Sequence, residues 1–137
     1  MIKNQVMTIK NMTFKVRQTL TVVGVVKPDS KEFAVNIGPS DDRIALHLNP
    51  RFNARGDTNI IVCNTFEADK WCQEQTEKCF PFSLGKDFKI VIRFTPSEFE
   101  VTLPGGSTFR FPNRLGAQEY SFMSFHKGAR IQSIEIK

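Results

Sequence analysis

The chain has 137 residues, 40% of them hydrophobic and 24% charged, which suits a single domain, residues 1–137, with a packed core and excludes a disordered chain. No apolar run approaches the roughly 20 residues that a membrane-spanning helix needs, and the N-terminal sequence lacks the apolar stretch of a secretory signal, so we expect no membrane insertion. The formal charge of +5 comes from basic residues spread singly along the chain, so we expect no nucleic-acid partner.

Short stretches of alternating apolar and polar residues recur along the chain, and no helical period of apolar residues persists for more than a turn. Such alternation is typical of strands with one buried face. In chain order, the predicted strands are Thr19–Val26, Glu32–Ile37, Ile44–Asn49, Asn59–Asn64, Phe88–Phe94, Glu98–Leu103, Thr108–Phe111, Tyr120–Phe125 and Arg130–Ile136. The sequence Leu103-Pro104-Gly105-Gly106 predicts a hairpin turn between the strands that flank it.

The spacing of these strands predicts the fold class. Many short strands, separated by turn residues at intervals of roughly 8–12 residues, are typical of an antiparallel two-sheet β-sandwich or jelly roll. The chain also has 13 phenylalanines, whose rings can fill the space between two sheets. We therefore expect one all-β domain.

One predicted strand carries an unusual polar face. Alternation places Ile44, Leu46 and Leu48 on one face of the segment. It places His47, Asn49 and, if the strand continues past Pro50, Arg51 on the other face. Because proline lacks a backbone donor, we expect this strand to end at a sheet edge or a bend near Pro50. An imidazole, an amide and a guanidinium in one row suit a ligand rich in hydroxyl groups. The alternative at this point is a solvated sheet face without a ligand.

The next two segments favour the ligand. Asn64 adds an amide at the end of a strand, and the only tryptophan, Trp71, precedes a carboxylate, Glu74, by three residues. The polar neighbours of Trp71 make its burial in the core unexpected. An exposed indole is a flat apolar surface on which the C–H face of a sugar can stack.

At these residues the sequence resembles a known family. The stretch HLNPRFNARGD, followed by VCN, WCQE and FPF and later by FPNRLG, is similar to the galectins, which are β-galactoside-binding lectins, and in particular to the single-domain prototype galectins of vertebrates. The similarity runs from Thr13 to the C-terminus. It implies a lectin that binds lactose- and N-acetyllactosamine-type glycans without a metal or cofactor. It also implies a homodimer that cross-links glycoconjugates, made in the cytoplasm and exported without a signal peptide.

The resemblance assigns roles to individual residues. The residues that it implies for galactose binding are His47, Asn49, Arg51, Asn64, Trp71 and Glu74. The first three would hydrogen-bond the axial 4-hydroxyl and the ring oxygen, Asn64 and Glu74 would hold the 6-hydroxyl, and Trp71 would stack on the apolar face. An equatorial 4-hydroxyl, as in glucose, would leave buried donors unpaired, which predicts strong discrimination.

Two positions depart from the family pattern. Thr76 stands where galectins usually have an arginine that touches the second sugar, and threonine cannot make a bidentate cationic contact. We expect Lys78, on the same face of an extended strand, to substitute in part. Arg55 stands where histidine is common, and we expect it to reach the second sugar or to pair with Asp57. The tripeptide Arg55-Gly56-Asp57 also matches an integrin-binding motif, although a charge pair with Arg51 or with Arg55 is the favoured role of Asp57.

The sequence gives less support to other function classes. The sequence has no recognisable nucleophile, phosphate-binding or metalloprotease motif, so an enzyme is not expected. A galectin-fold intracellular interaction or structural protein with weakened or lost sugar binding stays open because of Thr76. The three cysteines, Cys63, Cys72 and Cys79, form no CxxC pair, which favours free thiols over disulfides or a zinc site. The apolar segments Val6–Ile9 and Ile131–Ile136 suit a dimer interface or the core.

Overall fold

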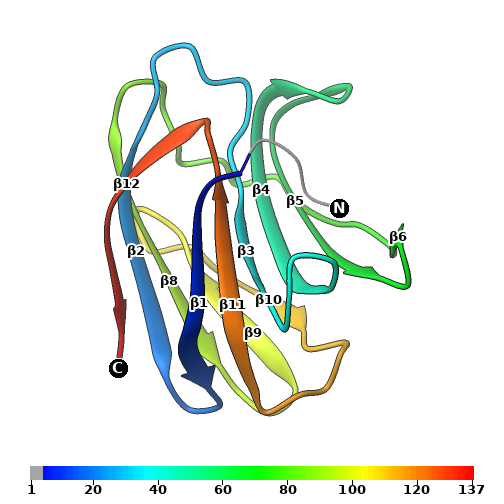
Figure 1. Cartoon of the computed structure of the whole chain (residues 1–137). Coiled ribbons are helices and arrows are strands. Elements are labelled where there is room, and N and C mark those ends of the chain that lie inside the picture. The colour runs from blue at the N-terminus through cyan, green and yellow to red at the C-terminus, as the bar shows by residue number, and fades with distance from the viewer. Residues whose placement is uncertain (1–4) are drawn as a thin grey trace.

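Two antiparallel β-sheets pack face to face in the computed structural model, which describes residues 5–137 (Figure 1). The seven-stranded sheet contains, in spatial order, β1 (Gln5–Lys15), β11 (Glu119–His126), β3 (Val35–Gly38), β4 (Ile44–Ala54), β5 (Asp57–Glu67) and β6 (Lys70–Trp71), with β7 (Gln75–Glu77) also paired to β5. The five-stranded sheet contains β10 (Thr108–Pro112), β9 (Glu98–Thr102), β8 (Asp87–Phe94), β2 (Thr19–Val26) and β12 (Ala129–Ile136). The predicted all-β sandwich is thus confirmed.

The core lies between the two sheets and is rich in aromatic rings. Phe94 stacks on Phe99 with ring centroids 4.9 Å apart and on Tyr120 at 5.4 Å. Phe33 stacks on Phe88 at 5.0 Å and meets Phe82 edge to face at 5.3 Å. All five phenylalanines are buried, so the alternating apolar positions of the two sheets interdigitate as expected of a sandwich.

The strand predictions were right in the middle of the chain and incomplete at short or irregular strands. Strand β2 has the predicted bounds, whereas β4 and β5 are longer than predicted and β3 begins at Val35 rather than Glu32. No prediction covered β1, whose register against β11 shifts twice, or the two- and three-residue strands β6 and β7, which are too short for alternation to show.

The expected end of the strand at Pro50 is wrong, because β4 continues to Ala54. The Pro50 carbonyl accepts a hydrogen bond from Phe33 N at 3.2 Å. The amide nitrogen of an antiparallel strand residue points to the same side as its carbonyl. The missing N–H of Pro50 therefore points toward the segment that precedes β3, where no regular ladder is broken.

A bulge in β4 corrects a second prediction, the placement of Ile44 beside Leu46 and Leu48. Ile44 pairs with Phe66 while His47 pairs with Asn64, so β4 has one residue more than β5 between these pairs. The extra residue moves Ile44 to the outer face, where it packs in a separate buried cluster with Phe66 and Phe122. Leu46 and Leu48 stay in the main core.

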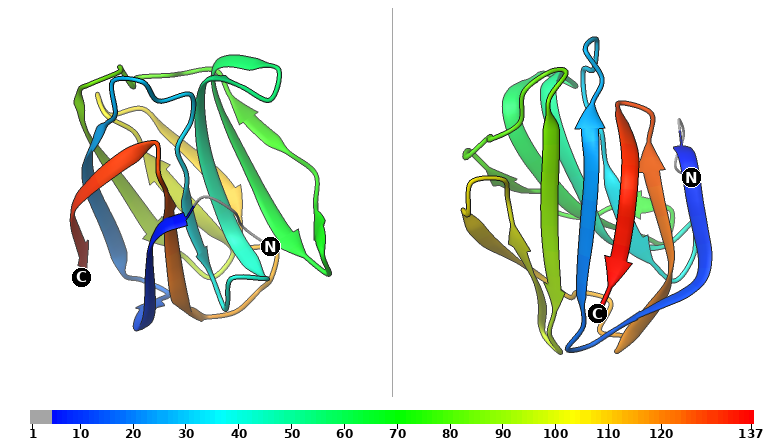
Figure 2. Two further views of the ribbon diagram at one scale, coloured as in Figure 1. Left: turned by 45° about the horizontal axis from the view of Figure 1, so that its top comes forward. Right: turned by 90° about the vertical axis from the view of Figure 1, so that its left-hand side faces the viewer.

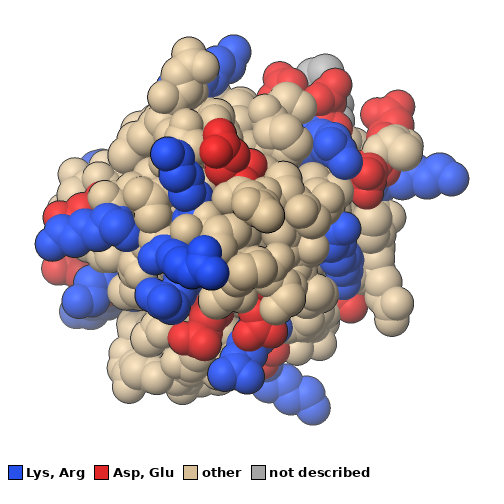
Figure 3. Space-filling model, turned by 90° about the horizontal axis from the view of Figure 1, so that it is seen from below, with Lys and Arg blue, Asp and Glu red and all other residues tan. Residues whose placement is uncertain are grey.

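The described residues, 5–137, include no helix that is long and apolar enough to cross a membrane. Figure 3 shows one end of the sandwich, where lysine and arginine side chains are interspersed with aspartate and glutamate. The charge on this end is therefore mixed, as the even distribution of basic residues along the sequence predicts.

Candidate functional site

The polar row lies on the outer face of the seven-stranded sheet, where β4, β5 and β6 run side by side (Figure 1). Because β4 continues past Pro50, its alternation brings Arg51 to the same face as His47 and Asn49, as predicted. The pairing of His47 with Asn64, and of Phe66 with Trp71, brings Asn64 and Trp71 to that face as well. The structure therefore brings residues from three strands together.

Arg51 holds the row together through different nitrogens of its guanidinium. Its Nε donates to Asn49 Oδ1 at 2.8 Å, and its Nη1 donates to Asp57 Oδ2 at 2.6 Å. Its Nη2 lies 4.0 Å from Glu74 Oε2. Arg51 is only 8% exposed, so these contacts compensate a largely buried charge. Asp57 thus forms the charge pair with Arg51 that the sequence indicated.

Glu32 is a site residue that the sequence analysis did not identify. Its Oε1 accepts hydrogen bonds from Asn49 Nδ2 and from Arg55 Nε, both at 3.1 Å. Asn49 Nδ2 also donates to Phe33 O at 2.8 Å, so the orientation of this buried amide is fully determined. The one indication in the sequence was that Glu32 begins the predicted strand Glu32–Ile37. In the structure an isolated β-bridge pairs Glu32 with Arg51.

A buried chain of hydrogen bonds sets the orientation of His47. Asn36 Nδ2 donates to Ser124 Oγ at 3.1 Å, which leaves Asn36 Oδ1 as the acceptor 2.6 Å from His47 Nδ1. The Nδ1 atom therefore carries the proton in the neutral ring, and Nε2 is an acceptor. Burial, with the nearby His126, Arg51 and Arg55, lowers the pKa of His47 to about 3. The imidazole is neutral at physiological pH.

The lowered pKa of His47 predicts how stability depends on pH. Between pH 6.5 and about 3 the unfolded chain protonates this histidine while the native protein does not. The free energy of unfolding should therefore fall as the pH drops below 6.5, by up to about 1.4 kcal/mol per pH unit from this group. We expect His47→Gln, which cannot titrate, to have a shallower pH dependence of the urea midpoint between pH 7 and 4.5. Parallel curves for the two proteins would contradict this origin.

Trp71 is an exposed platform at the edge of the site. It is 45% exposed, and its ring lies 4.6 Å from His47 and 4.9 Å from Phe66, centroid to centroid. Asn64 positions the loop that follows, because its Nδ2 donates to Cys72 O at 2.8 Å. The indole is therefore supported from below by the outer apolar cluster and open to solvent above, which excludes a core role.

The two positions that depart from the family pattern lie on different elements, Thr76 on β7 and Arg55 in the turn between β4 and β5. Thr76 is exposed and pairs with Val62 of β5. On its other side, Val62 pairs with Asn49 of β4. Arg55 pairs with Glu32 rather than with Asp57, at 3.1 Å. Arg55 and Asp57 are thus held by different partners, Glu32 and Arg51 respectively. Lys78 is exposed and is the residue after Glu77, at which β7 ends.

His126 is half-buried and lies beside the turn that joins β11 to β12. It is the last residue of β11, and its ring lies 5.9 Å from that of His47. Its Nε2 atom is buried without a hydrogen-bond partner among the described residues. Burial also lowers the pKa of His126, and Arg55 adds to this effect while Glu32 opposes it. The two histidines are far apart in sequence. They come close together because their strands, β11 and β4, both pair with the same strand, β3.

The site combines oriented hydrogen-bond donors, the acceptor nitrogen of the His47 imidazole and the exposed apolar surface of the Trp71 indole. Within residues 5–137 no group of three or more His, Cys, Asp or Glu side chains is arranged to hold a metal ion. Cys63 is buried, which raises the pKa of its thiol, whereas Cys72 and Cys79 are exposed and all three are free. The arrangement is suited to a ligand that combines hydroxyl groups with an apolar face.

Comparison with known proteins assigns the family. The family model for galactoside-binding lectins matches residues 5–136. A protein of Electrophorus electricus named beta-galactoside-binding lectin is 48% identical over 128 residues, which are 93% of this chain and 95% of that protein. Galectin-1 of Bos taurus is 41% identical over 127 residues, 93% of this chain and 94% of its own length.

Solved structures agree with the sequence matches. The crystal structure of Dario rerio galectin-1-L2 is 54% identical and superposes with a TM-score of 0.93, covering 94% of this chain and 98% of that one. The structure of congerin II with lactose and MES bound is 33% identical, with a TM-score of 0.92 over 96% of this chain and 98% of that one. With a matching family model, similar relatives and the same fold, the chain belongs to the galactoside-binding lectin family, the galectins.

Proposed function

We propose that the chain binds β-galactosides of the lactose and N-acetyllactosamine type on the outer face of the seven-stranded sheet, without a metal. The observation that carries the proposal is the Arg51-centred row of buried polar side chains next to the exposed indole of Trp71. Galactose has an axial 4-hydroxyl that can reach the row while its flat C–H face lies on the indole. Family membership and the lactose-liganded congerin II structure support the same ligand class.

We expect binding to be modest. The ligand exchanges water hydrogen bonds for protein hydrogen bonds with little net gain, so a dissociation constant between about micromolar and millimolar is expected. We also propose that the protein is not an enzyme. The carboxylates around the row, Glu32, Asp57 and Glu74, lie beside arginines, whereas glycoside hydrolysis needs a protonated acid next to a second carboxylate.

A column of immobilised lactose tests the proposal. A functional lectin is retained at physiological salt and eluted by free lactose but not by glucose. Release by salt alone would instead indicate charge-driven binding. Failure of the folded protein to bind would favour the alternative, an interaction protein of the galectin fold without sugar binding.

We propose that the protein acts as a homodimer that cross-links glycoconjugates, because weak single sites gain avidity when two are presented together. Strands β1 and β12 are edge strands of the two sheets and lie on the same side of the sandwich (Figure 2, right). They carry the partly buried residues Met7, Ile9, Ile131, Ile134 and Ile136. Val6, from the segment predicted to contribute, has a side chain outside the described part. Sedimentation over a range of concentrations tests the dimer.

We further propose that the protein is found in the cytoplasm and, after export without a signal peptide, outside the cell. The three free thiols support manufacture in a reducing compartment. Fractionation of cells and their medium, with detection of the untagged protein, tests this location.

We expect the part of the site around Thr76 to contribute little to the binding of the second sugar of a disaccharide. Glu74 is 53% exposed and Thr76 supplies no cation beside it. We expect Thr76→Arg to strengthen lactose binding by about three- to tenfold through a charge-assisted contact, and to leave galactose nearly unchanged. Calorimetry with both sugars measures the difference. Equal effects on the monosaccharide and the disaccharide would show that position 76 does not contact the second sugar.

A further inference from the structure

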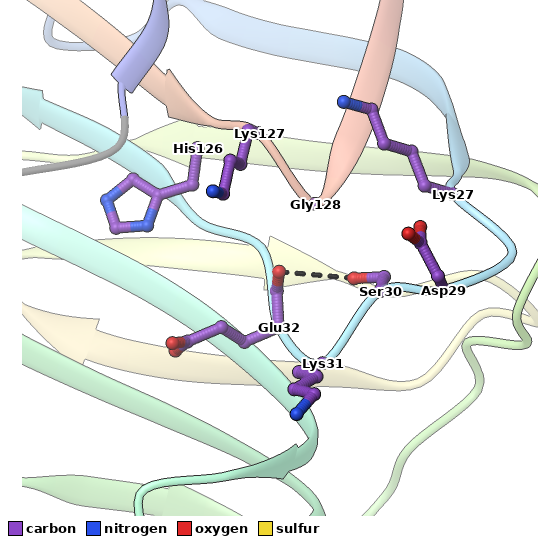
Figure 4. A pocket seen from close by; sticks show the side chains of 8 residues that line it. All are labelled: Lys27, Asp29, Ser30, Lys31, Glu32, His126, Lys127 and Gly128. Atoms are coloured by element: carbon purple, nitrogen blue, oxygen red, sulfur yellow. Dashed lines mark hydrogen bonds between the residues drawn. The ribbon is translucent and has the colours of Figure 1, made fainter.

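The polar row has different neighbours on its two sides. On the side of β3, Glu32 and His126 line a pocket (Figure 4). On the other side Trp71 lies on β6, a two-residue strand at the edge of the seven-stranded sheet (Figure 1). The residue on which the sugar stacks in the proposed function is therefore carried by the shortest strand in the described part of the chain.

The turn that leads into β6 has an unfavourable backbone conformation. Glu67 pairs with Lys70, so the hairpin has only two loop residues, Ala68 and Asp69. Their φ angles are 54° and 64°, both in the left-handed region. Two-residue hairpin turns require this conformation and favour glycine, asparagine or aspartate, whereas alanine is strained there by its Cβ atom. The turn by itself therefore does not hold β6 in place.

An apolar cluster on the outer face of the sheet supports the hairpin instead. Phe66 pairs with Trp71 across β5 and β6, and their ring centroids lie 4.9 Å apart. Phe66 is 6% exposed and belongs to the buried cluster that it forms with Ile44 and Phe122. Ile44 reaches this face because of the bulge in β4. The indole thus rests on a cluster that is anchored in β4, β5 and β11.

Two further contacts surround this support. Arg43 Nη2 donates to Glu67 Oε1 at 3.0 Å, which links the residue before Ile44 to the residue after Phe66. This ion pair is exposed, so we expect it to contribute little by itself. On the side of the polar row, the ring centroid of His47 lies 4.6 Å from that of Trp71. Phe66 is therefore a buried ring against the indole that takes no part in the polar row.

We propose that Phe66 is a positioning residue for sugar binding. It holds the strained β5–β6 hairpin so that the Trp71 indole is in place before the ligand arrives, which saves the ligand the cost of ordering it. Because Phe66 is almost fully buried, it offers no surface to the sugar itself. The inference rests on the proposed function and names the residue on which the stacking surface depends.

Calorimetry with lactose tests the proposal in the variant Phe66→Ala. We expect the affinity to fall by about three- to tenfold, the factor that corresponds to the loss of one aromatic contact. The matched control is Phe109→Ala, because Phe109 is 9% exposed and lies on β10 in the other sheet. This control should lose stability and keep the affinity for lactose. Phe66→Leu should have an intermediate affinity, and it replaces the alanine variant if that variant does not fold.

Fluorescence separates positioning of the indole from a general loss of stability. Trp71 is the only tryptophan of the chain, so the tryptophan emission reports on this ring alone. The anisotropy of the emission should be lower in folded Phe66→Ala than in the parent protein, because the indole turns more freely. Saturating lactose should bring the two values closer together. Phe109→Ala should have the anisotropy of the parent protein.

The strain at Ala68 allows a rescue experiment. Asparagine adopts positive φ readily, so Ala68→Asn should stabilise the turn. In the Phe66→Ala background it should restore most of the lost affinity, whereas Ala68→Asn alone should bind lactose like the parent protein.

Three results would each overturn the inference: parental lactose affinity in folded Phe66→Ala, parental anisotropy in that variant, or failure of Ala68→Asn to restore binding. Absence of lactose binding by the parent protein would instead reject the proposed function. The anisotropies of the parent protein and Phe66→Ala would in that case still decide whether Phe66 positions the indole.

Discussion

Replacing Arg51 by lysine is expected to weaken lactose binding by about 100-fold. The guanidinium uses separate nitrogens to reach Asn49 at 2.8 Å and Asp57 at 2.6 Å, and a third nitrogen lies 4.0 Å from Glu74. A lysine ammonium keeps the charge but cannot reproduce this planar set of contacts. Loss of about two charge-assisted hydrogen bonds, at roughly 1.5 kcal/mol each, corresponds to that factor. Titration calorimetry with lactose measures it.

The control for this substitution is Arg110→Lys. Arg110 lies on β10 in the other sheet, is 67% exposed in its side chain and pairs with Glu98 at 3.1 Å. It should bind lactose like the parent protein. Urea unfolding of both variants separates a binding defect from a folding defect. Retention of near-parental affinity by folded Arg51→Lys would show that positive charge alone suffices at this position.

Replacing Trp71 by alanine is expected to weaken lactose binding by at least about tenfold. The substitution removes the exposed ring on which the sugar face stacks, together with the apolar area that the sugar covers. Because the ring is 45% exposed, the free energy of unfolding should fall by less than about 1.5 kcal/mol. Trp71→Phe retains an aromatic plane and should show an intermediate affinity. Calorimetry and urea unfolding measure the two quantities.

Leu84→Ala is the matched control for Trp71→Ala. Leu84 is the other exposed large hydrophobic residue among residues 7–137, at 47%, and it lies outside the site. Its truncation should leave lactose affinity unchanged. Parental affinity in Trp71→Ala would remove the indole from the binding surface and, with it, the basis for placing the sugar between Trp71 and the polar row.

The tertiary fold fixes the orientation of the side chains that form this site. Asn36 on β3 and Ser124 on β11 orient His47 on β4, and Asn64 on β5 anchors the loop after Trp71. The contacts of Asn36 cross between neighbouring strands of the seven-stranded sheet, and the contact of Asn64 joins β5 to the loop after β6. The binding face is therefore as rigid as the sheet, which suits recognition by hydrogen bonds whose directions must be fixed before the ligand arrives.

The sequence alone determined those features that depend on local alternation. Period-two patterning predicted the strands of the sandwich, and the same patterning placed His47, Asn49 and Arg51 on one face. The polar neighbours of Trp71 predicted its exposure, which the structure shows at 45%. These inferences succeeded because side-chain direction in a strand follows from the residue's position along that strand.

Only the tertiary structure decided what depends on pairing between strands. The bulge that moves Ile44 to the outer face, the pairing of Arg55 with Glu32 rather than Asp57, and the contact of His126 with His47 all arise from register or from neighbours distant in sequence. Register is set by the packing of whole strands against one another. A bulge changes the register by one residue, and the alternation of apolar and polar residues in the sequence does not reveal it. For this reason the partners of Arg55 and His47 could not be predicted before the strands were placed.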